Sequence, residues 1–186
     1  MANKDAAFGL KAIGKVGQNR DNQGLSEYSI AASSTAIYQN DPVKMANTGE
    51  IEVAAAGDVL LGALTGVFFT DASTSKPTYA NHLKASNTAT DIVGFIADDP
   101  YERFEVQSAG TVSQTNIGNC ADISYTAGSS PNFVSKVEAS GTMAAGTAQL
   151  KIIGVSKDPD NNELGAANAN VVVTINEHFL KQEAGI

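Results

Sequence analysis

The chain has no tryptophan, one cysteine and two histidines, and only 6% of its 186 residues are aromatic. A lone Cys120 cannot form an intrachain disulfide, so we expect a fold that does not depend on oxidation, as suits a reducing cytoplasm. No apolar run approaches the ~20 residues of a membrane-spanning helix, and the first residues lack the apolar segment of a signal peptide. These absences exclude a disulfide scaffold and argue against a membrane partner.

Basic residues are also scarce, with 12 Lys and Arg against 20 Asp and Glu, a net charge of −8. Because phosphate binding requires a basic face, this balance argues against nucleic acid as a partner. The charge is uneven: residues 1–20 carry +3, from four basic and one acidic side chain, and the remainder carries −11. A basic leading segment on an acidic body predicts an arm that docks on an acidic neighbour, with a frayed tail as the alternative.

Patterns that carry catalytic or metal chemistry are missing. The two histidines, His82 and His178, have no His-x-x-x-His or Cys-x-x-Cys company, and no Gly-x-Ser-x-Gly or Gly-rich phosphate loop occurs. The pairs Asp98-Asp99 and Asp158-x-Asp160 are candidate calcium ligands, but Asp beside Pro is an ordinary turn former. We therefore predict that the protein is not an enzyme and holds no metal or cofactor.

Short polar–apolar alternations between turn residues predict a mainly β protein. Residues 26–31 alternate in this way, and residues 103–107 place Phe104 and Val106 on one face. Turns are indicated at Asp41-Pro42 and at Asp98-Asp99-Pro100. Since no long run has the 3.6-residue period of a helix, we expect a small β-barrel or β-sandwich body with at most one or two short helices.

Three segments are expected along the chain. Residues 1–24 are predicted to form an extended N-terminal arm, because their glycines disfavour a helix. Residues 25–180 should form the β-rich body, either as one barrel or as two lobes, with a polar loop at 71–90. Residues 181–186 would be a C-terminal tail.

Several segments, in chain order, resemble the head decoration (cement) proteins of tailed bacteriophages, especially the structural proteins of marine phages. The first is the Asn-Lys-Asp-Ala-Ala-Phe-Gly start, and the second is Asn-Asp-Pro-Val-Lys followed by a Gly-x-Ile…Ala-Ala-Gly-Asp hairpin. The others are Asp-Asp-Pro…Phe-Glu-Val-Gln, Gly-Asn-Cys-Ala-Asp, and the ending Pro-Asp-Asn…Val-x-Ile-Asn-Glu-His. The resemblance covers nearly the whole chain, and the loops at 71–90 and 126–147 depart from it.

The resemblance implies a structural virion protein on the outer surface of a capsid whose shell has the HK97-type fold. Its partner would be the major capsid protein, which it would brace against the pressure of packaged DNA. Self-association is also implied, as a homotrimer in preference to a dimer. The protein would be made in the cytoplasm of the bacterial host.

Two groups of contact residues are expected on this basis. In the N-terminal arm, three apolar anchors and three charge contacts would face the capsid: Phe8, Leu10, Ile13, Lys4, Lys11 and Lys15. The final strand would supply an oligomer interface through Val171, Val173, Ile175 and His178. Two other functions stay open: another virion part, such as a tail tube or head fibre, and a glycan-binding adhesin module built on the Tyr-bearing loops.

Overall fold

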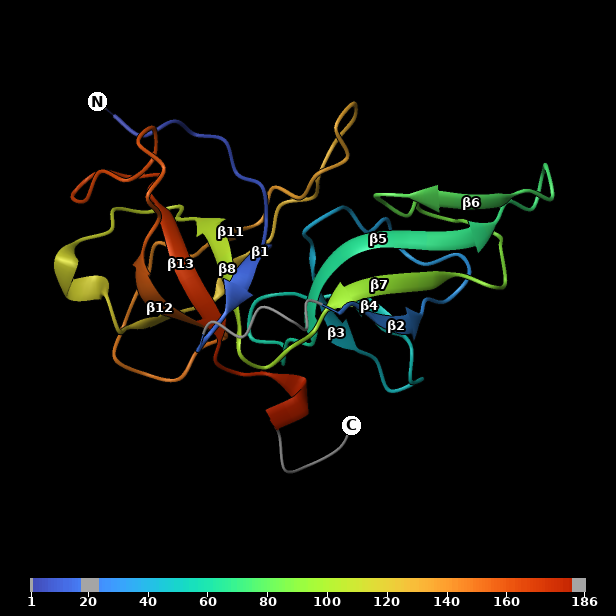
Figure 1. Ribbon diagram of the computed structural model, residues 1–186, viewed down its shortest axis with the longest axis horizontal. Coiled ribbons are helices and arrows are strands. Elements are labelled where there is room, and N and C mark those ends of the chain that lie inside the picture. The colour runs from blue at the N-terminus through green and yellow to red at the C-terminus, as the bar shows by residue number, and fades with distance from the viewer. Residues whose placement is uncertain (1, 18–23, 182–186) are drawn as a thin grey trace.

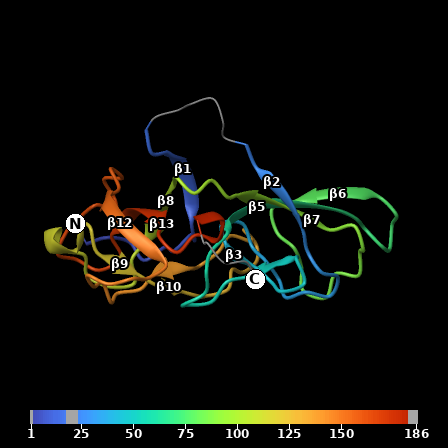
Figure 2. The same cartoon turned by 90° about the horizontal axis from the view of Figure 1, so that it is seen from below.

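The computed structural model describes residues 2–17 and 24–181, and these form two β lobes side by side along the longest axis (Figure 1). A view turned by 90° shows the same arrangement (Figure 2). The chain starts in one lobe, runs through the second and returns to the first. We call the first lobe, residues 2–16 and 102–175, the terminal lobe, and the second, residues 26–97, the middle lobe.

The terminal lobe is built on a five-stranded antiparallel sheet in the order β1-β8-β13-β12-β9. These strands are β1 (Lys11–Lys15), β8 (Glu102–Gln107), β13 (Asn170–Ile175), β12 (Leu150–Val155) and β9 (Cys120–Ala121). A two-stranded sheet of β10 (Ile123–Ser124) and β11 (Glu138–Ala139) accompanies it. The first and last strands of the described chain thus belong to one sheet.

Alternation places the core of the terminal lobe on one face of this sheet. Phe104 lies opposite Val173, and Val173 lies opposite Ile152 on the next strand. All three are fully buried, because in a strand every second side chain points to the same face. Cross-strand apolar rows of this kind hold a sheet in register.

The middle lobe contains six strands around the long strand β5. They are β2 (Ser26–Ser29), β3 (Pro42–Met45), β4 (Ile51–Val53), β5 (Gly62–Thr70), β6 (Pro77–Ala80) and β7 (Val93–Ala97). Strand β5 pairs with β7, β3 and β6, and β7 pairs in turn with β2. Val67 of β5 and Ile96 of β7 belong to a core separate from that of the terminal lobe.

The two lobes are joined by main-chain and side-chain hydrogen bonds. Leu60, before β5, donates to the Glu177 carbonyl at 3.0 Å and accepts from the Phe179 amide at 2.8 Å. The buried Gln149 side chain donates to the carbonyls of Ala55 and Asp58, at 2.8 and 2.7 Å. Leu60 also packs in the core of the terminal lobe, so that core extends into the junction.

The predicted fold class is confirmed: the chain is mainly β, with several open antiparallel sheets and no closed barrel among the described strands. The helices of the described chain are two 3-10 turns, η1 (Gln114–Asn116) and η2 (Phe179–Lys181). Of the two predicted body plans, the two-lobed one is present. The loop predicted at 71–90 contains strand β6, which pairs with β5. No described helix is long and apolar enough to cross a membrane.

The prediction of an extended arm at 1–24 is wrong for its described part, which is docked on the terminal lobe. Residues 11–15 form β1, which pairs with β8 with a register shift between Ala12 and Gly14. The sequence pattern missed this strand because the bulge and the glycines interrupt the alternation. Residues 18–23 of the predicted arm and 182–186 of the predicted tail lie outside the described residues.

Candidate functional site

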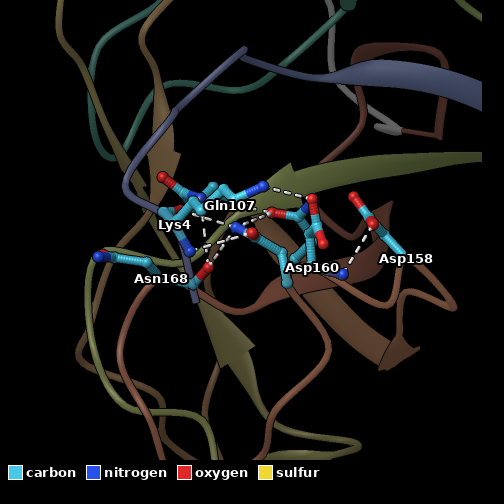
Figure 3. Close-up of polar contacts among 7 residues, drawn as sticks. Lys4, Gln107, Asp158, Asp160 and Asn168 are labelled. Atoms are coloured by element: carbon cyan, nitrogen blue, oxygen red, sulfur yellow. Dashed lines mark hydrogen bonds and ion pairs between the residues drawn. The ribbon is translucent and has the colours of Figure 1, made fainter. Parts of the chain in front are cut away.

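The N-terminal segment before β1 lies in a cradle of buried amide side chains (Figure 3). The Lys4 carbonyl accepts from Gln107 Nε2 and Asn161 Nδ2, both at 2.8 Å. The same side chains accept in return, Asn161 Oδ1 from the Lys4 amide at 3.1 Å and Gln107 Oε1 from the Ala6 amide at 2.9 Å. Both also donate to the Asn168 carbonyl. The cradle therefore recognises the main chain of the segment.

Gly9 and Leu10 form the second point of attachment. Gly9 has φ +76°, and a Cβ there would lie 2.4 Å from the Asn40 carbonyl oxygen and 2.5 Å from Ser135 Cβ. Only glycine fits such a left-handed, crowded position. The Leu10 amide donates to the Asn40 carbonyl at 2.9 Å, and Asn40 Nδ2 donates to the Phe8 carbonyl at 3.0 Å. A turn of the middle lobe thus clamps the segment.

The predicted apolar anchors have different environments. Leu10 is fully buried in the core of the terminal lobe, so its assignment as a capsid anchor is wrong for this fold. Phe8 is half-buried. Ile13, at the β1 bulge, is 44% exposed, and Val16 beyond it is 54% exposed. The exposed apolar surface of the segment is therefore at β1 and not before it.

The three predicted charge contacts each face a carboxylate of the same chain. Lys4 binds Asp160, whose hydrogen bond and charge raise the pKa of the lysine. Lys15 lies 2.6 Å from Asp99, and its hydrogen bond holds the pKa of that carboxyl below its usual value. Lys11 is 4.0 Å from a Glu105 oxygen and keeps an exposed side chain. The basic charge of the segment is thus largely balanced within the molecule.

Asp98 and Asp99 lie where the chain passes between the lobes, and their carboxylates bind residues of two different strands. Asp98 accepts from Ser26 Oγ at 2.9 Å and from the Tyr28 hydroxyl at 2.6 Å. Burial and the Asp98 hydrogen bond raise the pKa of Tyr28. Since Asp99 holds Lys15, the pair fastens β2 and β1 to one turn. Its carboxylates, considered above as calcium ligands, already have protein donors.

Asp158 and Asp160, the other candidate calcium pair, are also engaged. Asp158 accepts from the Asp160 amide at 3.0 Å, and Asp160 binds Lys4. Within the described ranges, no group of three or more His, Cys, Asp or Glu side chains could hold a metal ion.

The four residues predicted to form an oligomer interface are all buried in the chain itself. Val171, Val173 and Ile175 point into the core of the terminal lobe, and His178 is fully buried at the lobe junction. His178 Nδ1 accepts from the Leu180 amide at 3.1 Å, and burial lowers the pKa of the ring to about 4. The interface assignment is wrong, because all four side chains are buried within the chain and leave no surface for a second copy to contact.

The two loops that depart from the decoration-protein pattern meet in space. The His82 ring stacks on Phe133, with centroids 3.9 Å apart and planes 2° apart, and Asn81 Nδ2 donates to the Asn132 carbonyl at 3.1 Å. Burial lowers the pKa of His82. The sequence carries no signal for this contact, because the two rings lie about fifty positions apart in loops without periodicity.

A pocket of about 500 Å³ lies beside this contact, lined by His82, Lys84, Asn87, Phe69 and mostly small residues, both alanine and polar. No protein-family model matches the chain, and the searches of curated proteins and of solved structures also found no match.

Proposed function

We propose that the protein is a structural virion component that binds the outer surface of an HK97-type phage capsid and cements its major-capsid-protein subunits. The observation that carries the proposal is where the decoration-like segments lie. Residues 40–67 form β3, β4 and the first part of β5 in the middle lobe, residues 98–107 form the Asp98-Asp99 turn and β8, and residues 158–178 include the loop that holds Asn161 and strand β13. The segments that resemble decoration proteins thus supply strands to the sheets of both lobes.

The geometry favours a different set of capsid contacts from the one the sequence predicted. We propose that the exposed edge at β1 is the contact, through Lys11, Ile13 and Val16. β1 is an edge strand of the five-stranded sheet, so its outer side has no strand partner among the described residues and could accept a strand from a capsid subunit. Individually weak contacts of this kind suffice on a lattice, where many copies engage at once.

The remaining parts of the proposal follow from the resemblance. The protein would self-associate, as a trimer in preference to a dimer, and would be made in the host cytoplasm before joining the outer capsid surface. Its role would be mechanical and not catalytic. With a net charge of −8, it would have no nucleic acid partner.

The test is to mix the purified protein with capsids that lack it and to image the particles by cryo-EM. Ordered density on the outer shell at threefold or twofold positions is expected. Density only at a vertex or tail would move the protein to another virion part, such as a head fibre or tail tube. No bound protein would refute the proposal.

Ile13→Asp tests the contact surface, because it places a charge in an edge that must be desolvated on binding. We expect capsid affinity to fall about tenfold or more. Ile153→Asp is the matched control, since Ile153 of β12 is a similarly exposed isoleucine of the same sheet, 39% exposed. Equal binding by both variants and the unaltered protein would place the contact elsewhere. Deleting residues 2–15 is less informative, because it would remove β1 and the buried Leu10.

A further inference from the structure

The outward face of the middle-lobe sheet carries three aromatic rings, of which the outermost is largely exposed. Pairing in register puts Phe68 of β5 opposite Tyr79 of β6 and Val93 of β7. Phe95, two residues after Val93, therefore lies on the same face. The opposite face holds Val67 and Ile96 and packs on the lobe core. We call Phe68, Tyr79 and Phe95 the aromatic face.

The three rings of this aromatic face lie close together; Tyr79 is exposed, and Phe68 and Phe95 are half-buried. Tyr79 is 75% exposed, the most exposed large apolar side chain in the described part of the molecule. Its ring centroid lies 4.8 Å from that of Phe68 and 6.2 Å from that of Phe95, and the Tyr79 and Phe95 planes differ by 15°. Gly66, opposite Phe95 in register, has no side chain to fill the space in front of the rings.

The polar residues of β2 beside the rings offer a carboxylate and a hydroxyl, and neither carries a positive charge. Glu27 and Ser29 of β2 lie opposite Phe95 and Val93. Both are exposed, and neither side chain has a hydrogen-bond or ion-pair partner in the described chain. On the other side Asn81, held by Asn132, closes the end of the face. This border is anchored by the two loops that depart from the decoration-protein pattern.

This combination suits a sugar better than a protein or an anion. The C–H faces of a pyranose pack on exposed aromatic rings, and its hydroxyls donate to carboxylate and hydroxyl oxygens beside them. Protein interfaces also use aromatics but favour Arg and Met with them, and the strand positions of this face hold neither. Since Glu27 is its ionisable group and the chain is acidic, anionic polymers would be repelled.

We infer that the aromatic face binds a neutral oligosaccharide, with Tyr79 as the central stacking platform and Glu27 and Ser29 as hydrogen-bond acceptors for its hydroxyls. The site is distinct from the β1 edge, which belongs to the terminal lobe. A protein anchored through one lobe would present a sugar-binding surface on the other.

The experiment titrates the full chain with cellohexaose, maltohexaose and chitohexaose by calorimetry and by tyrosine fluorescence, which no tryptophan masks. Saturable binding of at least one sugar is expected. Tyr79→Ala should weaken it about tenfold, and Tyr79→Phe should retain it. Tyr101→Ala is the control, because Tyr101 is also exposed, at 63%, but contacts Lys181 away from this sheet.

The absence of binding to all three sugars, or equal loss in the Tyr79 and Tyr101 variants, would overturn the inference. Capsid binding by Tyr79→Ala separates the two proposals. We expect it to be unchanged, so a failure of sugar binding alone leaves the capsid proposal standing. If Tyr79→Ala loses capsid binding and no sugar binds, the aromatic face is a protein contact and the sugar assignment is wrong.

Discussion

At the scale of single residues, burial shifts the pKa values of two titratable groups, Asp41 and His178, in opposite directions. Asp41 is fully buried, and burial raises its pKa to about 6 despite the hydrogen bond from the Tyr38 amide. Burial lowers the pKa of His178 to about 4. At neutral pH the histidine is therefore uncharged, whereas the aspartate is ionised in an unfavourable environment.

These two shifts have opposite consequences for stability. The folded pKa of Asp41 is raised, so its contribution is fully present below about pH 4 and is lost as the pH rises through about 6. The folded pKa of His178 is depressed, so its contribution is present above about pH 6.5 and is lost as the pH falls through about 4. Between pH 4 and 6 the two slopes largely cancel.

Single substitutions should separate the two slopes. Relative to the unaltered protein, Asp41→Asn should become more stable as the pH rises from 4 to 6.5, and His178→Asn should become less stable. Each difference should reach about 3 kcal/mol, since one pKa unit corresponds to about 1.4 kcal/mol. Urea unfolding at pH 4, 5, 6 and 7 measures it. Difference curves that are flat with pH would show that these groups do not govern the dependence.

Gly9 gives a second prediction at this scale. Gly9→Ala should destabilise the protein by about 3 kcal/mol, because a Cβ at φ +76° would collide with Asn40 and Ser135. Gly17→Ala is the control: Gly17 also has a positive φ, +91°, but nothing lies within 4 Å of its Cβ position. Chemical unfolding compares the two, and equal effects would attribute the change to backbone strain alone.

At the scale of elements, the N-terminal segment depends on side chains from distant parts of the chain. Gln107 is fully buried and contacts both the Lys4 carbonyl and the Ala6 amide. Gln107→Ala leaves the Ala6 amide without its partner and the Lys4 carbonyl with Asn161 as its remaining donor, and it should destabilise the docked segment by about 1–3 kcal/mol.

Hydrogen exchange at the Ala6 amide is the local measurement for Gln107→Ala, because it reports opening of this segment rather than of the whole lobe. Faster exchange at Ala6 is expected, with slow exchange retained in β13. Asn3→Ala is the control, since Asn3 Nδ2 donates at the surface to the carbonyls of Glu163 and Ala167. Unchanged protection of Ala6 in the Gln107 variant would mean that the cradle does not hold the segment.

At the scale of the whole molecule, Gln149 links the lobes. Its buried side chain serves Ala55 and Asp58 on one side and accepts from the Ile123 amide at 3.0 Å on the other. Gln149→Ala should lower stability by about 3 kcal/mol, because three main-chain groups lose their partner.

Calorimetry tests this coupling. We expect one unfolding transition in the unaltered protein, since the core of the terminal lobe includes residues from the junction. Gln149→Ala should lower its midpoint. Asn176→Ala, which removes an exposed hydrogen bond to the Ala148 carbonyl, should change stability by less than about 0.5 kcal/mol. Similar midpoints for the two variants would show that Gln149 does not couple the lobes.

The sequence by itself determined the mainly β class, the shortage of helices and, locally, which side chains of a strand share a face and where turns lie. Alternation in residues 103–107 was enough to put Phe104 and Val106 on one buried face, because side-chain direction in a strand has a period of two. The turn at Asp98-Asp99-Pro100 also followed from residue type alone.

Only the tertiary structure decided where the N-terminal segment lies and which of its residues are available. The period of a strand shows which side chains share a face, but not which distant strand supplies the main-chain partner. Asn161 lies 157 positions from Lys4, and no local pattern specifies that contact. For the same reason the burial of Leu10 and His178 and the meeting of His82 with Phe133 followed from packing, which is set by the fold as a whole.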